Sequence, residues 1–159
     1  MQAASRSGLV LAARGQLAAA KDLFDRLQHD VPDLPETLHG LGVVAALADD
    51  PARAEDLLRR ALARRAEFGE AHRDLAVLLA ARGDHAQAVT HFERSLAIDG
   101  DDADVHNDVA VSYAHLASPD RVLHHLQEAV RIEPEHAIAN ANLLVARRGA
   151  RPTLTSRRR

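Results

Sequence analysis

The chain has 159 residues, of which 47% are hydrophobic, 3% aromatic and 27% charged. Its formal net charge of −3 and its sequence pI near 6.3 provide no basic surface for nucleic acid, and the absence of cysteine excludes disulfides, iron–sulfur clusters and thiolate zinc sites. No apolar run approaches the roughly 20 residues that cross a bilayer, so we expect no membrane insertion and a cytoplasmic location, with the periplasm as an alternative.

The first half of the sequence carries four amphipathic helical patterns. Roughly a fifth of the chain is alanine, so we expect helices that approach closely over small side chains. The predicted helices span residues 2–14, 17–30, 35–48 and 51–65. Pro32 and Pro35 fall between helices, and Asp50–Pro51 places an N-cap residue before a proline at the first helical position.

The second half continues the same pattern. Its predicted helices span residues 69–82, 85–98, 103–116, 119–132 and 137–148. The Gly83–Asp84 turn separates the first two, with Asp84 as a candidate N-cap, and Ser118–Pro119 begins the fourth as Asp50–Pro51 does in the first half. We expect no strand longer than three residues.

The helices repeat with a fixed period. Leu75–Ala76, Ala88 and Phe92 find their counterparts 34 residues later in Val109–Ala110, Val122 and Leu126. One helix–turn–helix in each period of this length is the signature of an α-solenoid. Four periods tile residues 1–34, 35–68, 69–102 and 103–136, and residues 137–149 match the first helix of a fifth.

The residues at fixed positions of the period resemble the tetratricopeptide repeat. The matching residues are Gly8, Ala20, Phe24 and Pro32; Leu41, Gly42, Ala54 and Ala61; Leu75, Ala76, Ala88 and Phe92; and Val109, Ala110, Tyr113, Ala129 and Pro134. The resemblance implies an all-α fold in which antiparallel hairpins stack into a right-handed superhelix as one domain of residues 1–149, with residues 137–149 as a capping helix. Residues 150–159 form a basic tail that we expect to be disordered.

The sequence shows no catalytic site, no cofactor motif and no metal site. His124 and His125 are adjacent, so on a helix they point about 100° apart and cannot easily share a metal. The acidic run from Asp99 to Asp104 lacks the calcium ligands of an EF-hand, because alanines stand at its fifth and twelfth positions. We interpret it as a solvated turn whose carboxylates favour the start of the next helix.

The resemblance implies a concave groove lined by the first helix of each repeat. The predicted groove residues are His39, Val43, Glu70, Arg73, Asp74, Val77, Asp104, Asn107, Asp108, Val111, His115, Asn142 and Val145. Val43, Val77, Val111 and Val145 share one repeat position and predict an aliphatic row beside an acidic wall. The alternative is that this row packs against neighbouring helices as part of the core.

Two functions follow from these features. The first is a protein-interaction module that binds a peptide or helix of a partner protein, more readily a basic or neutral one than an acidic one. The second is an accessory segment of a larger enzyme such as a glycosyltransferase, a sulfotransferase or a hydroxylase. We favour the first, without enzymatic activity, because residues 150–159 resemble a chain end rather than a linker. Ile138, Leu143 and Leu144 lack a covering helix, so homo-oligomerisation through residues 137–149 is also expected as an option.

Overall fold

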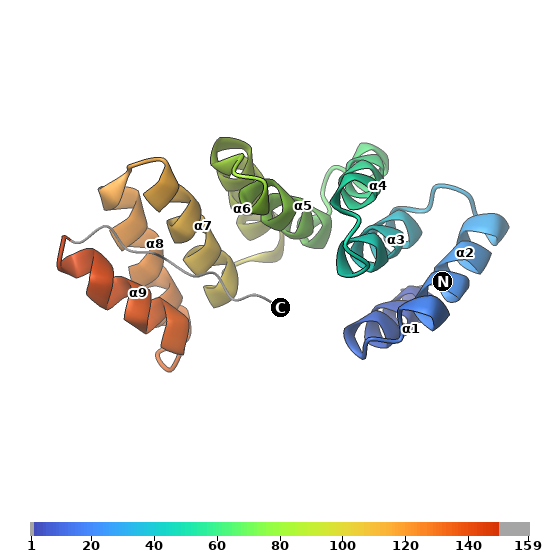
Figure 1. Cartoon of the computed structure of the whole chain (residues 1–159), viewed down its shortest axis with the longest axis horizontal. Coiled ribbons are helices and arrows are strands. Elements are labelled where there is room, and N and C mark those ends of the chain that lie inside the picture. Colours follow the sequence, from blue (N-terminus) through green and yellow to red (C-terminus); the bar gives the residue numbers. More distant parts are fainter. Residues whose placement is uncertain (1, 150–159) are drawn as a thin grey trace. The chain divides into compact units, whose positions relative to one another are not determined.

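The computed structural model describes residues 2–149, with the backbone alone for Gln2. Within this range the chain forms nine α-helices and no β-strand (Figure 1). They are α1 (Gln2–Ala13), α2 (Leu17–Asp30), α3 (Pro35–Leu47), α4 (Pro51–Arg64), α5 (Gly69–Ala81), α6 (His85–Asp99), α7 (Ala103–His115), α8 (Pro119–Ile132) and α9 (Ala137–Arg147). The predicted helices are confirmed, since each begins at the predicted residue and ends within one residue of the predicted end. The basic tail at residues 150–159 lies outside the described residues.

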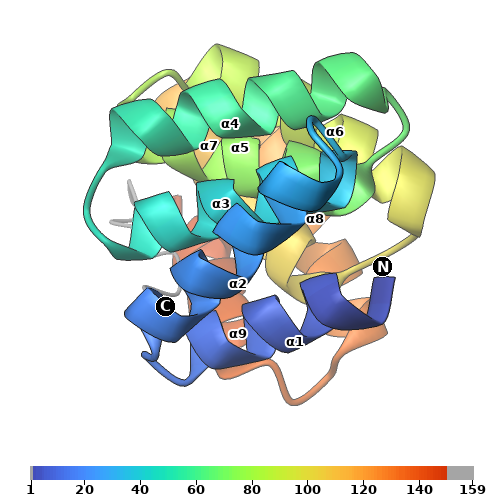
Figure 2. The ribbon, with the colours of Figure 1, turned by 90° about the vertical axis from the view of Figure 1, so that its right-hand side faces the viewer.

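The chain divides inside α5 into two compact units, Met1–Leu75 and Ala76–Arg159. In the first unit, α1 packs on α2 and α3 packs on α4, while α3 also contacts α1 and α2. Figure 2 shows the α3–α4 hairpin, whose helices lie side by side and are joined by a short turn. In the second unit, α7 packs against α6, α8 and α9, and α8 packs against α9. Each unit is thus built from helical hairpins.

The turn inside each hairpin repeats the 34-residue period in its backbone. Gly15, Asp49, Gly83 and Ala117 all have positive φ angles, between 54° and 90°. In each turn the next residue donates its backbone N–H to a carbonyl five residues earlier, at 2.9–3.1 Å. These bonds satisfy carbonyl groups that the end of the first helix leaves unpaired.

The helix caps agree with the sequence only in part. Asp50 accepts a hydrogen bond from the backbone N–H of Arg53 at 3.1 Å, as expected. Ser118 makes no such cap, because its hydroxyl donates to the carbonyl of Leu116. The carboxylate of Asp84 also makes no backbone cap, and accepts instead from the side chain of Gln87.

Two further N-caps precede α7 and α9. Asp102 accepts from the backbone N–H of Val105 at 3.1 Å, so the acidic turn does favour the start of the next helix. Before α9, Nδ1 of His136 accepts from the backbone N–H of Ala139 at 3.3 Å. A histidine therefore serves here as an N-cap.

Small residues in the first unit make room for one aromatic ring. Phe24 on α2 is fully buried. A Cβ atom added to Gly8 on α1 or to Gly40 on α3 would overlap its ring, and a Cβ on Gly42 would lie 3.0 Å from Cγ of Leu58. The small residues thus allow α1, α2 and α3 to approach closely.

The second unit has its own apolar core. Ala110 on α7, Val122 and Leu126 on α8 and Leu143 on α9 form one buried cluster. Leu144, in contrast, is 52% exposed. Our expectation that Leu143 and Leu144 are both uncovered is therefore wrong for Leu143, because that side chain completes the core of the last hairpin.

Candidate functional site

The predicted groove residues lie on α3, α5, α7 and α9, the first helices of successive hairpins. His39, Asn107, Val111 and Asn142 are buried, while Glu70, Val77 and His115 are exposed and the remaining six are half-buried. Burial divides this set into side chains that hold helices together and side chains that face solvent.

His39 and Asp74 form a polar contact within the first unit. Nε2 of His39 lies 2.8 Å from Oδ2 of Asp74, and the ring of His39 packs against Phe68 with 5.0 Å between ring centroids. Burial alone would raise the pKa of Asp74, but the hydrogen bond and charge of His39, followed by the charge of Arg73, outweigh it and hold that pKa below its usual value. The carboxylate is stabilised by its neighbours in the fold.

Asn107 and Asn142 form the corresponding contact in the second unit. The amide nitrogen of Asn142 donates to the amide oxygen of Asn107 at 2.9 Å. A second contact between the same elements joins Nε2 of His136 to Oδ1 of Asp104 at 3.1 Å. Buried polar groups are costly unless paired, so these bonds fix α9 against α7.

The two contacts share a spacing that the repeat frame could have revealed. His39 and Asp74 are 35 residues apart, and so are Asn107 and Asn142. The first residue of each pair occupies the fifth position of its repeat, and the second occupies the sixth position of the next. This spacing is the signal in the sequence that points to the pairs, whereas each residue taken alone looked like a groove residue.

The predicted aliphatic row is graded rather than uniform. Val77 is 45% exposed, Val111 is buried, and Val43 and Val145 are half-buried. Val111 packs in the core as the alternative interpretation expects, whereas Val77 faces solvent, and a ligand-binding role for the row stays a prediction.

Large exposed hydrophobic side chains within residues 3–149 follow a simple distribution. Val10, Leu47, Val77 and Leu144 lie on first helices, and Leu116 is the C-cap residue of α7. The second helices α2, α4, α6 and α8 carry none of them. Single exposed hydrophobics are ordinary in proteins, but their restriction to one class of helix marks the first helices as the apolar part of the surface.

Acidic side chains also lie on two of the first helices, α5 and α7. Glu70 is exposed at the start of α5, and Asp104 and Asp108 are half-buried on α7. The amide of Asn107 donates to Asp108 at 3.4 Å, and Asp104 contacts His136 as described above. His115 lies at the end of α7, where its ring stacks on that of His85 at 3.9 Å between centroids.

Within residues 2–149, no group of three or more histidine, aspartate or glutamate side chains lies close enough together to hold a metal ion. None of the helices in residues 2–149 is long and apolar enough to span a membrane.

Comparisons with known proteins agree with this geometry. A family model described as tetratricopeptide repeat matches residues 45–110. No curated protein matches the sequence. Among solved structures, a chain of the APC/C hetero-tetramer Cut9–Hcn1 is similar with a TM-score of 0.82 and 22% identity, over 90% of this chain. This chain spans 29% of the length of that one.

Two further structures are similar over most of their own length. YrrB, described as a TPR protein with an unusual peptide-binding site, has a TM-score of 0.77 and 18% identity, over 92% of this chain and 75% of YrrB. PilF of Pseudomonas aeruginosa has a TM-score of 0.82 and 17% identity, over 93% of this chain and 69% of PilF. At these identities the likeness shows the fold, an α-solenoid of helical hairpins.

Proposed function

We propose that this chain is a protein-interaction scaffold whose first helices bind a peptide or a helix of a partner. The tetratricopeptide-repeat model that matches residues 45–110 and the similar solved structures support this proposal. The observation that carries the proposal is the restriction of exposed large hydrophobics to the first helices and the C-cap of α7. Repeat solenoids present extended binding surfaces of this kind. The peptide-binding site named for YrrB, a similar structure, supports the same mode.

The proposed partner is basic or neutral. The first helices carry acidic side chains in each unit, Glu70 in the first and Asp104 and Asp108 in the second, and the second unit also holds the exposed Val77 and the half-buried Val145. Like charges repel an acidic ligand, whereas apolar side chains of the partner gain by leaving water. Exposed charges are screened beyond about 8 Å at physiological salt, so we expect the acidic residues to change association rate and selectivity more than final affinity.

The buried polar pairs have a different role in this proposal. His39, Asn107 and Asn142 are enclosed and bonded to other side chains. We assign them to the packing of consecutive first helices rather than to contact with a ligand. Asp74 is bonded to His39, Val111 is buried and His115 stacks on His85, so we leave these three out as well. The residues proposed to face a ligand are Val43, Glu70 and Arg73 in the first unit and Val77, Asp104, Asp108 and Val145 in the second.

The test uses short random peptides displayed as a library against the full chain. Selected peptides are measured by titration against the unmodified chain and against Leu47→Glu and Val77→Glu, which place a charge on exposed first-helix positions. The matched controls are Ala63→Glu and Ala97→Glu, which place the same charge on exposed positions of α4 and α6.

We expect the selected peptides to be basic or neutral and to lose at least about tenfold in affinity for one of the first-helix variants, which corresponds to about 1.4 kcal/mol. The control variants should bind as the unmodified chain does. Equal loss in both sets, or loss only in the controls, would move the binding surface to the second helices and overturn the proposal.

A further inference from the structure

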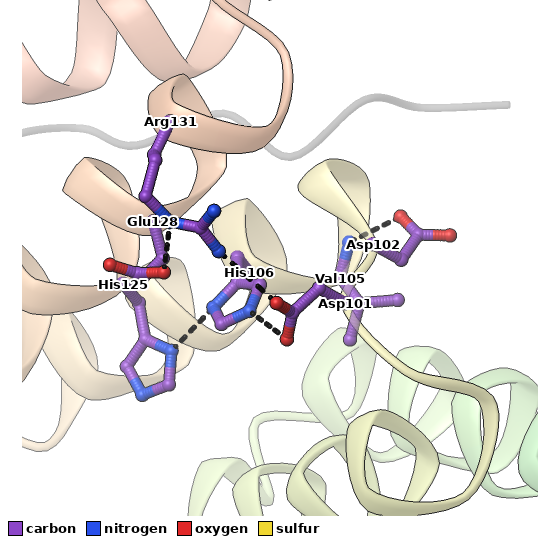
Figure 3. Close-up of polar contacts among 7 residues, drawn as sticks. All are labelled: Asp101, Asp102, Val105, His106, His125, Glu128 and Arg131. Atoms are coloured by element: carbon purple, nitrogen blue, oxygen red, sulfur yellow. Dashed lines mark hydrogen bonds and ion pairs between the residues drawn. The ribbon is translucent and has the colours of Figure 1, made fainter.

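Helix α7 is held on two sides by pairs of histidines. His106 on α7 and His125 on α8 are both buried, and their Nδ1 atoms lie 3.0 Å apart. Figure 3 shows the two rings facing each other between the helices. At the other end of the helix, His115 stacks on His85 of α6, with 5° between the ring planes. Both helix–helix contacts are among those that build the second unit.

The His106–His125 contact depends on the number of protons it holds. A hydrogen bond between two Nδ1 atoms requires that one ring carry a proton on Nδ1 and that the other offer a lone pair there. Nε2 of His106 takes no part in this contact and lies 3.6 Å from Oδ1 of Asp101. A proton on both Nδ1 atoms would set two N–H groups against each other and break it.

The charged groups around the pair lie in the loop before α7 and on α8, and α9 packs against both helices. The loop before α7 supplies Asp101, which is also paired with Arg131 of α8 at 3.1 Å. Helix α8 itself supplies Arg121, His124 and Glu128, and Glu128 is bonded to Arg131 at 2.8 Å (Figure 3). Within α9 the titratable side chain is Arg147, while His136 at its N-cap contacts Asp104.

This setting makes a second proton unfavourable. Burial, followed by the positive charges of His106, His124 and Arg121, lowers the pKa of His125 to about 4, and Glu128 opposes the shift. Burial and the charge of His115 also lower the pKa of His85, while Asp84 raises it. In both pairs the folded structure resists the doubly charged state.

We propose that the two histidine pairs make the second unit acid-sensitive, so that protonation releases α7 from α8 and α6. Acid acts on both pairs in the same direction, because each gains a repulsion between two imidazolium rings. Helix α7 also carries Val109 and Ala110, which are fully buried. Its release would therefore expose part of the apolar core of this unit.

The sign of the effect follows from linkage. A histidine whose pKa is lower in the folded state binds protons more readily in the unfolded state. The contribution of neutral His125 to the stability of the folded state is complete above the unfolded-state pKa of about 6.5. It is lost as the pH falls from there toward the folded-state pKa of about 4. Acid therefore weakens the unit across this window, and lowering the pH further adds nothing from His125.

The chain contains a natural reporter of this change. Tyr113 is its one tyrosine, and it has no tryptophan. The ring of Tyr113 stacks on His125 at 5.6 Å between centroids, and its hydroxyl donates to Glu93 of α6 at 2.7 Å. Its near-ultraviolet circular dichroism therefore reports on both contacts of α7.

The experiment follows the near-ultraviolet signal of Tyr113 and the urea midpoint of the full chain between pH 7.5 and 4.5. The test variant is His125→Gln, whose amide can still pair with His106 but does not titrate. The control is His29→Gln, which removes an exposed histidine of α2. Each measurement is repeated in a Glu93→Gln background, because the carboxylate of Glu93 accepts from the hydroxyl of Tyr113 and its own titration could change the Tyr113 signal.

We expect the folding equilibrium constant to fall about tenfold more between pH 7 and pH 5 in the unmodified chain than in His125→Gln. The Tyr113 signal should fall with it, and His29→Gln should behave as the unmodified chain does. If His125→Gln follows the same pH course as the unmodified chain, the proposal is wrong.

A second measurement applies if His125→Gln does not fold. Nuclear magnetic resonance titration of the histidine ring protons in the unmodified chain should show one buried imidazole that remains neutral at pH 5, with the Tyr113 resonances changing as it protonates. Ordinary titration of all ten histidines near pH 6.5, with Tyr113 unchanged, would overturn the proposal.

Discussion

Asn107 and Asn142 join α7 to α9 through one hydrogen bond that lies out of water. A hydrogen bond of this kind adds modestly to stability, but leaving one partner buried and unpaired costs its full desolvation. The same reasoning applies to His39 and Asp74 between α3 and α5. At the scale of single residues, α3 is thus fixed to α5 and α7 to α9 by polar pairs whose members are 35 residues apart.

Removing one amide of the Asn107–Asn142 pair should destabilise the fold by more than the hydrogen bond itself contributes. We expect Asn107→Ala to lower the free energy of unfolding by about 1–3 kcal/mol, because the amide of Asn142 remains buried without its partner. The Asn107→Ala, Asn142→Ala double variant should cost less than the sum of the two single variants, by about 0.5–3 kcal/mol. Urea denaturation of the four proteins measures this coupling, and strict additivity would show that the hydrogen bond has no energetic role.

Gly40 provides a steric test of the first unit. We expect Gly40→Ala to destabilise the chain by about 1–3 kcal/mol, because the new methyl group overlaps the ring of Phe24. In a Phe24→Leu background the same substitution should cost less than half as much, since the smaller side chain leaves space. The measurement is the change in urea midpoint caused by Gly40→Ala in each background, and equal changes would place the strain elsewhere.

At the scale of the element, the hairpin turn decides where each first helix ends. The residue two positions after the end of each first helix has a positive φ in four successive repeats, yet glycine occupies this position only at Gly15 and Gly83. Asp49 is a residue type that tolerates the left-handed region through local hydrogen bonds, whereas Ala117 is not. The turn before α8 therefore carries backbone strain that the turns at Gly15 and Gly83 avoid.

Ala117→Gly should stabilise the chain. The left-handed conformation costs alanine about 1–2 kcal/mol, while glycine loses about 0.5–1 kcal/mol more conformational entropy on folding. We expect a net gain of about 0.5–1 kcal/mol in the free energy of unfolding, measured by urea denaturation. Gly83→Ala is the matched reverse substitution and should destabilise by a similar amount; a loss of stability in Ala117→Gly would contradict this account.

At the scale of the whole molecule, the last described helix carries an exposed apolar side chain. In the earlier hairpins the position of Leu144 is held by Gly8, Gly42, Ala76 and Ala110, all buried against other parts of the fold. Leu144 is 52% exposed and too large for such close packing. Homo-oligomerisation through α9 stays a prediction, and Leu144 is the side chain that tests it.

Leu144→Glu should leave the fold intact and abolish self-association if α9 forms the contact between copies. Light scattering over a range of concentrations measures the association. Leu143→Glu is an unsuitable probe, because a charge in the buried cluster with Val122 and Leu126 should unfold the last hairpin. A dimer that persists in Leu144→Glu would place the contact elsewhere, and a monomeric unmodified chain would exclude it.

The local sequence alone determined the helices, their boundaries and the repeat. Apolar spacing, prolines and glycines act between residues close in the chain, so the nine helices within residues 2–149 and the 34-residue frame follow from them without knowledge of the fold. The small residues at Gly8 and Gly42 predicted close helix approach for the same reason. The right-handed superhelix and the single domain of residues 1–149 stay predictions.

Only the tertiary structure decided which polar residues of the first helices face solvent. His39, Asn107 and Asn142 have the residue types of a binding surface, but each is buried against a partner on a neighbouring helix. The contact between His106 and His125 likewise joins two helices whose side chains no local pattern pairs. Burial and charge at these positions depend on distances across the fold, and such distances arise only when separate helices pack together.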